Sequence, residues 1–207
     1  MESSEATTPR PGLRERKKQR TRETIARVAL RLFAERGYGQ TTLAEIADAA
    51  DVSTRTIFAY YQGKEDILFS DLPVQFDRLQ QALENRAPGI STLDALSDFL
   101  AGLDPRDEQV GLRKEVVAQN VGLRRAEGAR FARVEELIAE SIAKDLDAQP
   151  GDIRPLLVAA SMTAAFRAAR SRIESELGEP ISHEQARAVM DEVLDFLRGG
   201  LDRLKGH

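Results

Sequence analysis

The stretch from residue 20 to residue 69 constrains the fold of this 207-residue chain more than any other part of it. Apolar residues recur there at helical spacing, in short runs that are separated by turn signals. The first predicted helix, residues 20–36, has one apolar stripe made of Ile25, Val28, Ala29, Leu32 and Phe33. Gly37 follows, at the position where a left-handed glycine commonly ends a helix.

Two further short helices follow at the spacing of a helix-turn-helix. Thr42 and Glu45 have the arrangement of a capping box at the start of the second helix. Residues 51–52 form the predicted turn, and Ser53 is placed to cap the third helix, residues 54–60. In a helix-turn-helix the later helix of the pair enters the major groove of DNA. The pattern therefore predicts sequence-specific DNA binding.

The distribution of charge favours this prediction, although the total charge of −4 does not. Residues 10–36 contain 10 basic and 3 acidic residues, for a local charge of +7. Residues 37–207 contain 20 basic and 29 acidic residues, for a local charge of −9. Basic side chains gathered at one end can contact phosphates while the rest of the chain stays acidic. Charge alone leaves open the alternative of a merely solvated basic helix face.

The predicted third helix has an inner and an outer side. Val52, Ile57 and Tyr61 suit packing against the rest of the domain. Arg55 is the best candidate for reading a base, because its guanidinium matches the O6 and N7 acceptors of guanine. The residues predicted to contact DNA, through bases or phosphates, are Thr42, Ser53, Thr54, Arg55, Thr56, Tyr60 and Lys64.

The rest of the chain is also predicted to be helical, without strand-like alternation or an internal repeat. The further predicted helices span residues 64–84 (with a bend at Pro73), 91–102, 107–121, 129–146, 153–177 and 182–205. The predicted fold class is all-α with about nine helices. The predicted parts are a disordered basic tail (1–17), a helix-turn-helix DNA-binding domain (18–66) and a larger helical domain (67–207).

Composition excludes several other classes of protein. The chain has no Cys, and therefore no disulfide, thiolate nucleophile or cysteine-based metal site. Its two His have no metal-binding partner at a useful spacing, and there is no glycine-rich phosphate loop or nucleophile elbow. No apolar run approaches the roughly 18 residues of a membrane helix, and no signal peptide is recognisable. We therefore expect a cytoplasmic protein that is not an enzyme and has no catalytic residue, cofactor or metal ion.

Residues 32–68 contain five short motifs: Leu32-Phe33 with Gly37-Tyr38, Thr41-Thr42-Leu43 with Ile46-Ala47, Ala50 with Val52-Ser53, Ile57-Phe58 with Tyr60-Tyr61, and Lys64-Glu65-Asp66-Ile67-Leu68. With these motifs the segment resembles the N-terminal domain of the TetR family of bacterial transcriptional repressors. Phe58 departs from the family pattern, because many members have Tyr there, and Tyr61 replaces a common Phe. Residues 14–22 are similar to the basic N-terminal arm with which some members add phosphate or minor-groove contacts.

The resemblance implies that residues 67–207 form a ligand-binding and dimerisation domain. In the last predicted helix, five apolar residues follow a coiled-coil-like spacing: Met190, Leu194, Leu197, Leu201 and Leu204. The preceding helix has small residues that allow close helix approach: Ala159, Ala160, Ala164, Ala165, Ala168 and Ala169. We expect these last two helices of two subunits to form a four-helix homodimer interface. The alternative is that the stripe packs only within one chain.

A ligand pocket is expected among the middle helices, where larger apolar residues accompany a few polar ones. The candidates are Phe76, Phe99, Leu103, Asn120, Phe131, Met162, Thr163, Phe166 and Arg167, each of which alone suits a plain core position better. Residues 120–124 and 162–167 resemble a subgroup with an acyl-CoA-like ligand-binding domain. That resemblance implies a hydrophobic or amphipathic effector with an anionic group near Arg124, Arg125 or Arg167.

The sequence thus predicts a homodimeric, ligand-responsive repressor of a pseudo-palindromic DNA operator. Effector binding is expected to move the helix that begins at Lys64 and to change the separation of the two DNA-binding domains. Two alternatives stay open: a constitutive DNA-binding protein without an effector, and a helical enzyme or interaction module whose helix-turn-helix serves only for packing. A fully packed C-terminal core favours the first, and DNA binding that is unchanged on replacing Arg55 favours the second.

Overall fold

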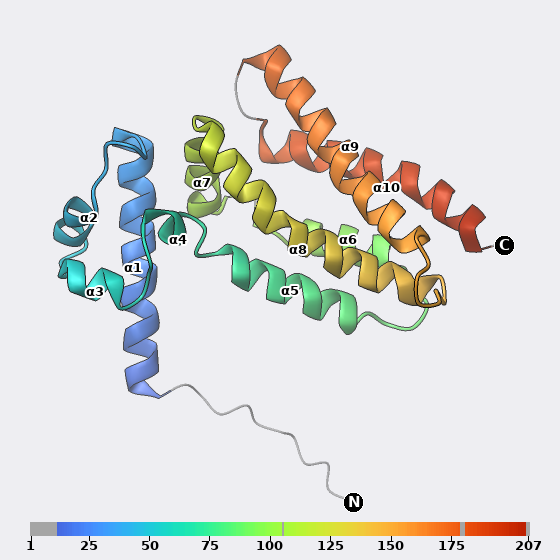
Figure 1. The fold of residues 1–207 in the computed structure, drawn as a ribbon, viewed down its shortest axis with the longest axis horizontal. Helices are drawn as coiled ribbons and strands as arrows, with labels where there is room; N and C mark the ends of the chain where they lie inside the picture. The colour runs from blue at the N-terminus through green and yellow to red at the C-terminus, as the bar shows by residue number, and fades with distance from the viewer. Residues whose placement is uncertain (1–11, 105, 179–180, 206–207) are drawn as a thin grey trace, which may run out of the picture. The chain divides into compact units, whose positions relative to one another are not determined.

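The computed structural model describes residues 12–104, 106–178 and 181–205, apart from the side chains of residues 183 and 201–205. Every regular element within these residues is an α-helix, which confirms the predicted all-α class (Figure 1). The chain divides into two units, Met1–Ser70 and Asp71–His207. The division therefore falls four residues later than the predicted boundary after residue 66, and each unit is described by itself.

The N-terminal unit consists of α1 (Leu13–Arg36), α2 (Leu43–Ala49), α3 (Thr54–Phe58) and α4 (Lys64–Leu68). α1 packs against α2 and α4, and α2 packs against α3 (Figure 1). The core of this unit is made of large side chains that are almost fully buried: Ile25, Phe33, Ile46, Ile57, Tyr61 and Ile67. Three helices that are too short to be stable alone are thus held by one shared apolar centre.

α1 begins earlier than predicted, because residues 13–17 are helical rather than part of a disordered tail. The expectation for residues 1–11 lies outside the described residues. The segment from Leu13 to Arg20 is exposed throughout, so no apolar periodicity marked it as a helix. Arg, Lys, Gln and Glu are nevertheless good helix formers, and the buried part of α1 provides the nucleus on which they extend.

The C-terminal unit consists of α5 (Leu72–Glu84), α6 (Thr92–Ala101), α7 (Glu108–Ala118), α8 (Val121–Asp145), α9 (Arg154–Leu177) and α10 (His183–Lys205). α8 and α9 form the most extensive helix pair, and α10 packs on α9 and α6 (Figure 1). One apolar core joins five of these helices: Leu79, Leu83, Leu93, Ala95, Leu96, Leu137, Ile138, Ile142, Val158, Ala159, Met162, Val193, Leu194 and Leu197. No helix among the described residues is long and apolar enough to cross a membrane.

Two predicted helix boundaries in this region are wrong. The helix expected over residues 64–84 is divided into α4 and α5, so the described residues contain ten helices instead of about nine. Pro73 lies in the first turn of α5, where the missing N–H of proline is tolerated. α8 begins at Val121 instead of near Ala129, because the side chain of Asn120 accepts a hydrogen bond from the backbone N–H of Leu123 at 3.2 Å and caps the helix.

The predicted seam of the last helix has a different role from the one expected. Leu194 is fully buried and Leu197 is 8% exposed, both within the core of a single chain, and Met190 packs against that core. The side chains of Leu201 and Leu204 lie outside the described residues. The described part of this stripe is covered by α6 and α9. It therefore packs within the monomer, as the alternative to a dimer seam had predicted.

Candidate functional site

The turn between α2 and α3 fixes the direction of the predicted recognition helix. Asp51 has a φ of 54°, in the left-handed region, and the backbone N–H of Val52 donates to the carbonyl of Ala47 at 2.9 Å. Ser53 then caps α3, because its Oγ accepts a hydrogen bond from the backbone N–H of Thr56 at 3.0 Å. The predicted cap is thus confirmed, and the start of α3 is fixed by hydrogen bonds local to the turn.

The predicted capping box at the start of α2 is also confirmed. The backbone N–H of Glu45 donates to Thr42 Oγ1 at 3.2 Å, and the backbone N–H of Thr42 donates to Glu45 Oε2 at 2.8 Å. This backbone hydrogen bond, with the Thr42 hydroxyl, lowers the pKa of the Glu45 carboxyl. The Thr42 hydroxyl itself donates to Glu45 at 2.8 Å. Both donors of Thr42 are therefore used within the chain, which leaves its predicted phosphate contact without a free donor from this residue.

The outer side of α3 has one basic side chain, Arg55, among small polar and apolar side chains. Ser53, Thr54 and Arg55 are exposed, whereas Thr56 and Tyr60 are half-buried. The side chain of Arg55 makes no ion pair or hydrogen bond in the described part of the chain. Its backbone carbonyl accepts a helical hydrogen bond from the N–H of Ala59 at 3.1 Å. Its guanidinium is consequently available to an external partner while its backbone is fixed by the capped helix.

Tyr61 joins the end of α3 to α1. It is 2% exposed, and its hydroxyl donates to the carbonyl of Arg22 at 2.8 Å. The guanidinium of Arg22 lies 5.5 Å from the centre of the tyrosine ring, and burial raises the pKa of Tyr61. The predicted packing role of Tyr61 is confirmed, and it orients the recognition helix relative to α1.

Lys64 has an internal role that the sequence did not reveal. Its Nζ donates to the carbonyls of Tyr38 at 2.7 Å and Thr41 at 2.8 Å, and lies 4.6 Å from the centre of the Tyr38 ring. Thr41 is 1% exposed, and its hydroxyl lies 3.0 Å from the carbonyl of Gly37. The ammonium group therefore holds the α1–α2 loop, and its predicted contact with a phosphate stays a prediction. The sequence did not reveal this structural role of Thr41, because a Thr directly before a capping Thr looks like part of the same cap.

The apolar residues predicted to bind a ligand lie on or next to several helices of the C-terminal unit. Phe76 of α5 and Phe131 of α8 stack edge to face, with ring centres 5.8 Å apart. Met162 is 3% exposed in the core, and Phe99 packs against that core from its rim. Leu103 and Phe166 are half-buried.

The three polar candidates have different surroundings. Asn120 caps α8, as described above, so its side-chain oxygen is committed to the backbone. Thr163 Oγ1 donates to Glu135 Oε2 at 2.8 Å, between α9 and α8. Arg167 is exposed on α9. Their convergence on a ligand stays a prediction.

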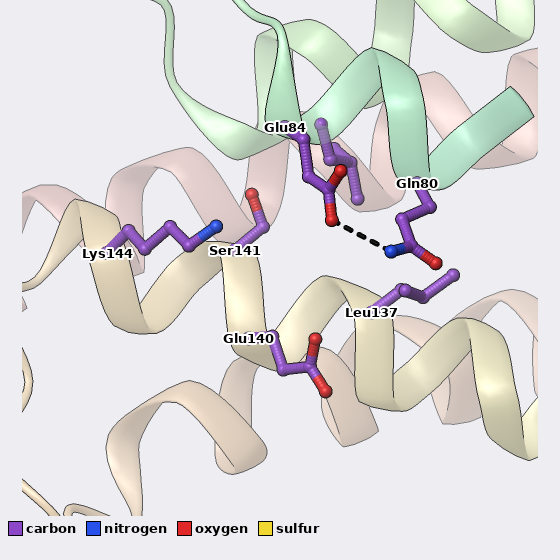
Figure 2. A pocket seen from close by; sticks show the side chains of 7 residues that line it. Gln80, Glu84, Leu137, Glu140, Ser141 and Lys144 are labelled. Atoms are coloured by element: carbon purple, nitrogen blue, oxygen red, sulfur yellow. Dashed lines mark hydrogen bonds between the residues drawn. The ribbon is translucent and has the colours of Figure 1, made fainter. Parts of the chain in front are cut away.

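Two hollows in the C-terminal unit lie elsewhere. Figure 2 shows the first, between α5 and α8, where Gln80 and Glu84 lie across from Leu137, Glu140, Ser141 and Lys144. Its volume of about 20 Å³ is enough for one water molecule. The second, of about 430 Å³, is lined by the α5–α6 loop with Lys144 and Asp145. None of the nine predicted ligand residues lines either hollow.

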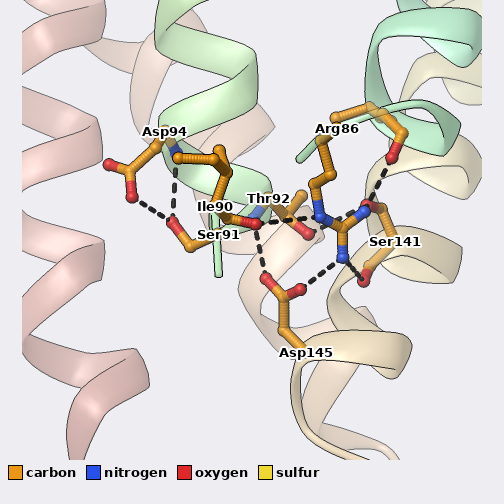
Figure 3. A network of polar contacts seen from close by, with 8 residues as sticks. Arg86, Ile90, Ser91, Thr92, Asp94, Ser141 and Asp145 are labelled. Atoms are coloured by element: carbon orange, nitrogen blue, oxygen red, sulfur yellow. Dashed lines mark hydrogen bonds and ion pairs between the residues drawn. The ribbon is translucent and has the colours of Figure 1, made fainter. Parts of the chain in front are cut away.

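A largely buried polar network joins the α5–α6 loop to the end of α8, beside these hollows (Figure 3). Arg86 donates to the carbonyl of Leu83 at 2.7 Å, to Ser141 Oγ at 2.7 Å and to Asp145 Oδ1 at 2.5 Å. Asp145 Oδ2 accepts the backbone N–H of Thr92 at 2.7 Å. One ion pair thus satisfies the start of α6 and ties it to the ends of α5 and α8.

A second ionic cluster lies at the start of α5. Arg113 is 6% exposed; it pairs with Asp71, and its Nε lies 4.0 Å from Glu127 Oε1. Burial raises the pKa of Glu127 and lowers the pKa of Lys114, whose charge is also disfavoured by Arg113. Arg113 therefore holds α5, α7 and α8 together through two carboxylates. No cluster of possible metal ligands occurs among the described residues.

Two family models match the chain in two blocks. Residues 25–70 match the model of bacterial regulatory proteins of the tetR family, and residues 93–202 match the MftR C-terminal domain. The first block covers α2, α3 and α4 with the buried part of α1. The second covers the chain from α6 to α10.

Whole-length relatives agree with both matches. The transcriptional regulator TcmR of Streptomyces glaucescens is 32% identical over 191 residues, which cover 81% of this chain and 82% of that protein. MftR of Mycobacterium tuberculosis, a proposed mycofactocin biosynthesis regulator, is 30% identical over 91% of this chain and 95% of its own. In these proteins the helix-turn-helix belongs to a transcriptional regulator, not to an enzyme.

Solved structures share the fold at lower identity. SmeT, the repressor of a multidrug efflux pump of Stenotrophomonas maltophilia, has a TM-score of 0.61 at 19% identity, over 86% of this chain and 90% of that one. FadR, a fatty acid degradation regulator of Bacillus halodurans, has a TM-score of 0.58 at 18% identity, over 93% of this chain and 98% of that one. The chain thus belongs to the tetR family of bacterial regulatory proteins, as a DNA-binding transcriptional regulator with an MftR-type C-terminal domain.

Proposed function

We propose that this regulator is a homodimeric repressor that leaves a pseudo-palindromic operator when a small effector binds its C-terminal unit. The observation that carries the proposal is Arg55, whose exposed guanidinium has no ion pair with any described residue and lies on a helix whose start is fixed by Ser53. Such a side chain meets guanine with two hydrogen bonds in the major groove. The cytoplasm is the proposed location, because that is where a bacterial operator is reached.

DNA contacts divide into one that reads a base and others that position the protein. Arg55 reads the base, and Thr54, Thr56 and Tyr60 are proposed to meet the sugar-phosphate backbone around it. The exposed basic start of α1, residues 14–20, adds a set of cations that only Glu15 opposes locally. Each phosphate that these cations neutralise makes binding more sensitive to salt.

The proposed dimer interface is the side of α9 and α10 that faces away from the core. On α9 the small residues Ala164, Ala165 and Ala168 are exposed, while Ala159 is buried in the monomer. On α10 the side chain of Phe196 is 80% exposed, whereas Leu194, on the side of the helix that faces the core, is fully buried. An exposed aromatic among small residues is typical of a surface that a second subunit covers.

Replacing Phe196 by Glu is expected to convert the dimer into a monomer without unfolding the chain. In a two-fold interface the two new carboxylates lie near each other, and like charges there cost on the order of several kcal/mol. Light scattering after size-exclusion chromatography measures the mass, and circular dichroism measures the helix content. Val74→Glu, at a 57% exposed apolar position on α5, is the matched control and should stay dimeric. A dimeric Phe196→Glu variant would refute this interface.

The effector is proposed to be hydrophobic or amphipathic, and an acyl-CoA is the candidate class. The stacked Phe76 and Phe131 offer an aromatic surface between α5 and α8, of which Phe131 is 41% exposed. SmeT is known in a complex with triclosan, and FadR is a regulator of fatty acid degradation. Arg124, Arg125 and Arg167 are the proposed partners of an anionic group of the effector.

The whole proposal is tested with DNA selected by the purified protein from a random duplex library. A single enriched inverted repeat is the expected result. Palmitoyl-CoA or triclosan is then added to the complex, and release is followed by fluorescence anisotropy. Release requires an effector that prefers the DNA-free form, and a coupling of about 1–3 kcal/mol weakens DNA binding about 5- to 150-fold. No enriched sequence would refute the repressor model.

A second candidate function is a constitutive repressor without an effector. It is favoured by the packing of two predicted ligand residues, since Met162 lies in the core and Phe99 packs against that core. A selected operator that stays bound at saturating concentrations of every probe would support this candidate.

A further inference from the structure

Phe58 is an exposed aromatic side chain on the outer side of the recognition helix. It is 60% exposed, and the only other large apolar side chain in the described part of the N-terminal unit with comparable exposure is Leu13, at the start of α1. The packing of α3 does not need Phe58, because Ile57 and Tyr61 fill the core beneath it. The ring therefore contributes nothing that the fold requires.

The chemistry of the ring limits what it can contact on DNA. A phenyl ring has no hydrogen-bond donor or acceptor, so it cannot bind a phosphate oxygen or the polar edge of a base. In the major groove, the 5-methyl group of thymine is the apolar group that an A·T base pair offers to such a side chain, and a G·C pair has none. Burial against that methyl group is the favourable contact left to Phe58.

The position of Phe58 relative to Arg55 places this contact near the proposed guanine. Side chains three residues apart on a helix are neighbours, with Cβ atoms about 5–6 Å apart. Successive base pairs are separated by about 3.4 Å along the duplex axis. Two neighbouring side chains on α3 therefore reach base pairs that are one or two steps apart.

We propose that Phe58 is a specificity-determining residue that reads the methyl group of a thymine one or two base pairs from the guanine read by Arg55. This inference rests on the proposed operator binding by α3. It adds an apolar element to the half-site and gives the phenyl group, in place of the Tyr that many family members have, a function that needs no hydroxyl.

The test replaces each thymine of the selected operator in turn by deoxyuridine, which lacks only the 5-methyl group. Replacing the one critical thymine in a single half-site is expected to weaken binding of the full-length protein about fourfold, which is the effect of losing the burial of one methylene-sized group. Replacement in both half-sites is expected to weaken binding about 16-fold if the two sites act independently. Fluorescence anisotropy at constant salt measures the affinities.

Two variants assign the effect to the side chain. Phe58→Ala should bind the thymine and deoxyuridine operators equally, whereas Arg55→Ala should keep the fourfold difference while binding both more weakly. Circular dichroism checks that Phe58→Ala is folded, as expected for a side chain that is 60% exposed. The inference is overturned if no thymine shows the effect, or if the effect persists in Phe58→Ala. A library selection without any enriched sequence would instead overturn operator binding itself, and this inference with it.

Discussion

Asp145→Ala is expected to lower the free energy of unfolding by about 3–5 kcal/mol, the usual cost of removing one partner of a buried ion pair. The side chains of Asp145 and Arg86 are 8% and 14% exposed. The substitution leaves the Arg86 guanidinium without its counter-ion and the backbone N–H of Thr92 without its acceptor at the start of α6. Urea unfolding followed by circular dichroism measures the change.

Controls separate burial from the mere loss of an ion pair. Glu176→Ala breaks a pair with Arg172 on the surface of α9, where the side chains are 59% and 80% exposed, and should cost less than about 1 kcal/mol. Asp145→Asn keeps the shape and an acceptor for Thr92, and should fall between the two. If Asp145→Ala costs no more than Glu176→Ala, the network in Figure 3 does not stabilise the fold.

The double variant Arg86→Met/Asp145→Leu removes both charges and fills the space with apolar atoms. It is expected to be more stable than Asp145→Ala, because neither charge is then left buried without a partner. This comparison keeps the prediction testable even if the single variant is too unstable for a complete urea titration.

Arg55→Ala is expected to weaken binding to the selected operator by about 5- to 150-fold per half-site, since a bidentate contact with guanine contributes about 1–3 kcal/mol of discrimination. Because a dimer uses two half-sites, the loss of affinity for the whole operator is expected to exceed the loss for one half-site. The fold should be unchanged, because the side chain is exposed and makes no ion pair in the described part of the chain. Anisotropy titrations and melting curves measure the two properties.

A modified base shows whether Arg55 acts through guanine. An operator with 7-deazaguanine lacks the N7 acceptor, so it should weaken the wild-type complex and leave Arg55→Ala almost unaffected. Lys17→Ala, in the basic start of α1, is the contrasting variant, with an expected reduction in the salt slope of about 0.9 per half-site and no change in sequence preference. Equal affinity of Arg55→Ala and the wild type for the operator would mean that α3 does not read the sequence.

The N-terminal unit followed from the sequence because its signals are local. Capping by Thr42 and Ser53 involves residues three positions apart, and the buried side of α1 repeats within one helix. The start of α1 was missed for the same reason, since its exposed residues have no apolar periodicity. Lys64 was predicted to contact a phosphate from its place at a helix start. Its internal role was not visible in the sequence, because the carbonyls of Tyr38 and Thr41 that it binds lie more than 20 residues earlier.

The sequence by itself determined the helical class, the caps of α2 and α3 and the family pattern, because each depends on residues within one or two turns of each other. Only the tertiary structure decided which side of α10 is core and which is free, because Leu194 and Phe196 are both large and apolar but only Leu194 is covered by other helices. It also decided that Arg86, in a loop without any motif, holds Asp145 at a separation of 59 residues. Helical periodicity gives the direction of a side chain around the axis of its helix, whereas burial depends on which distant helices pack against that side.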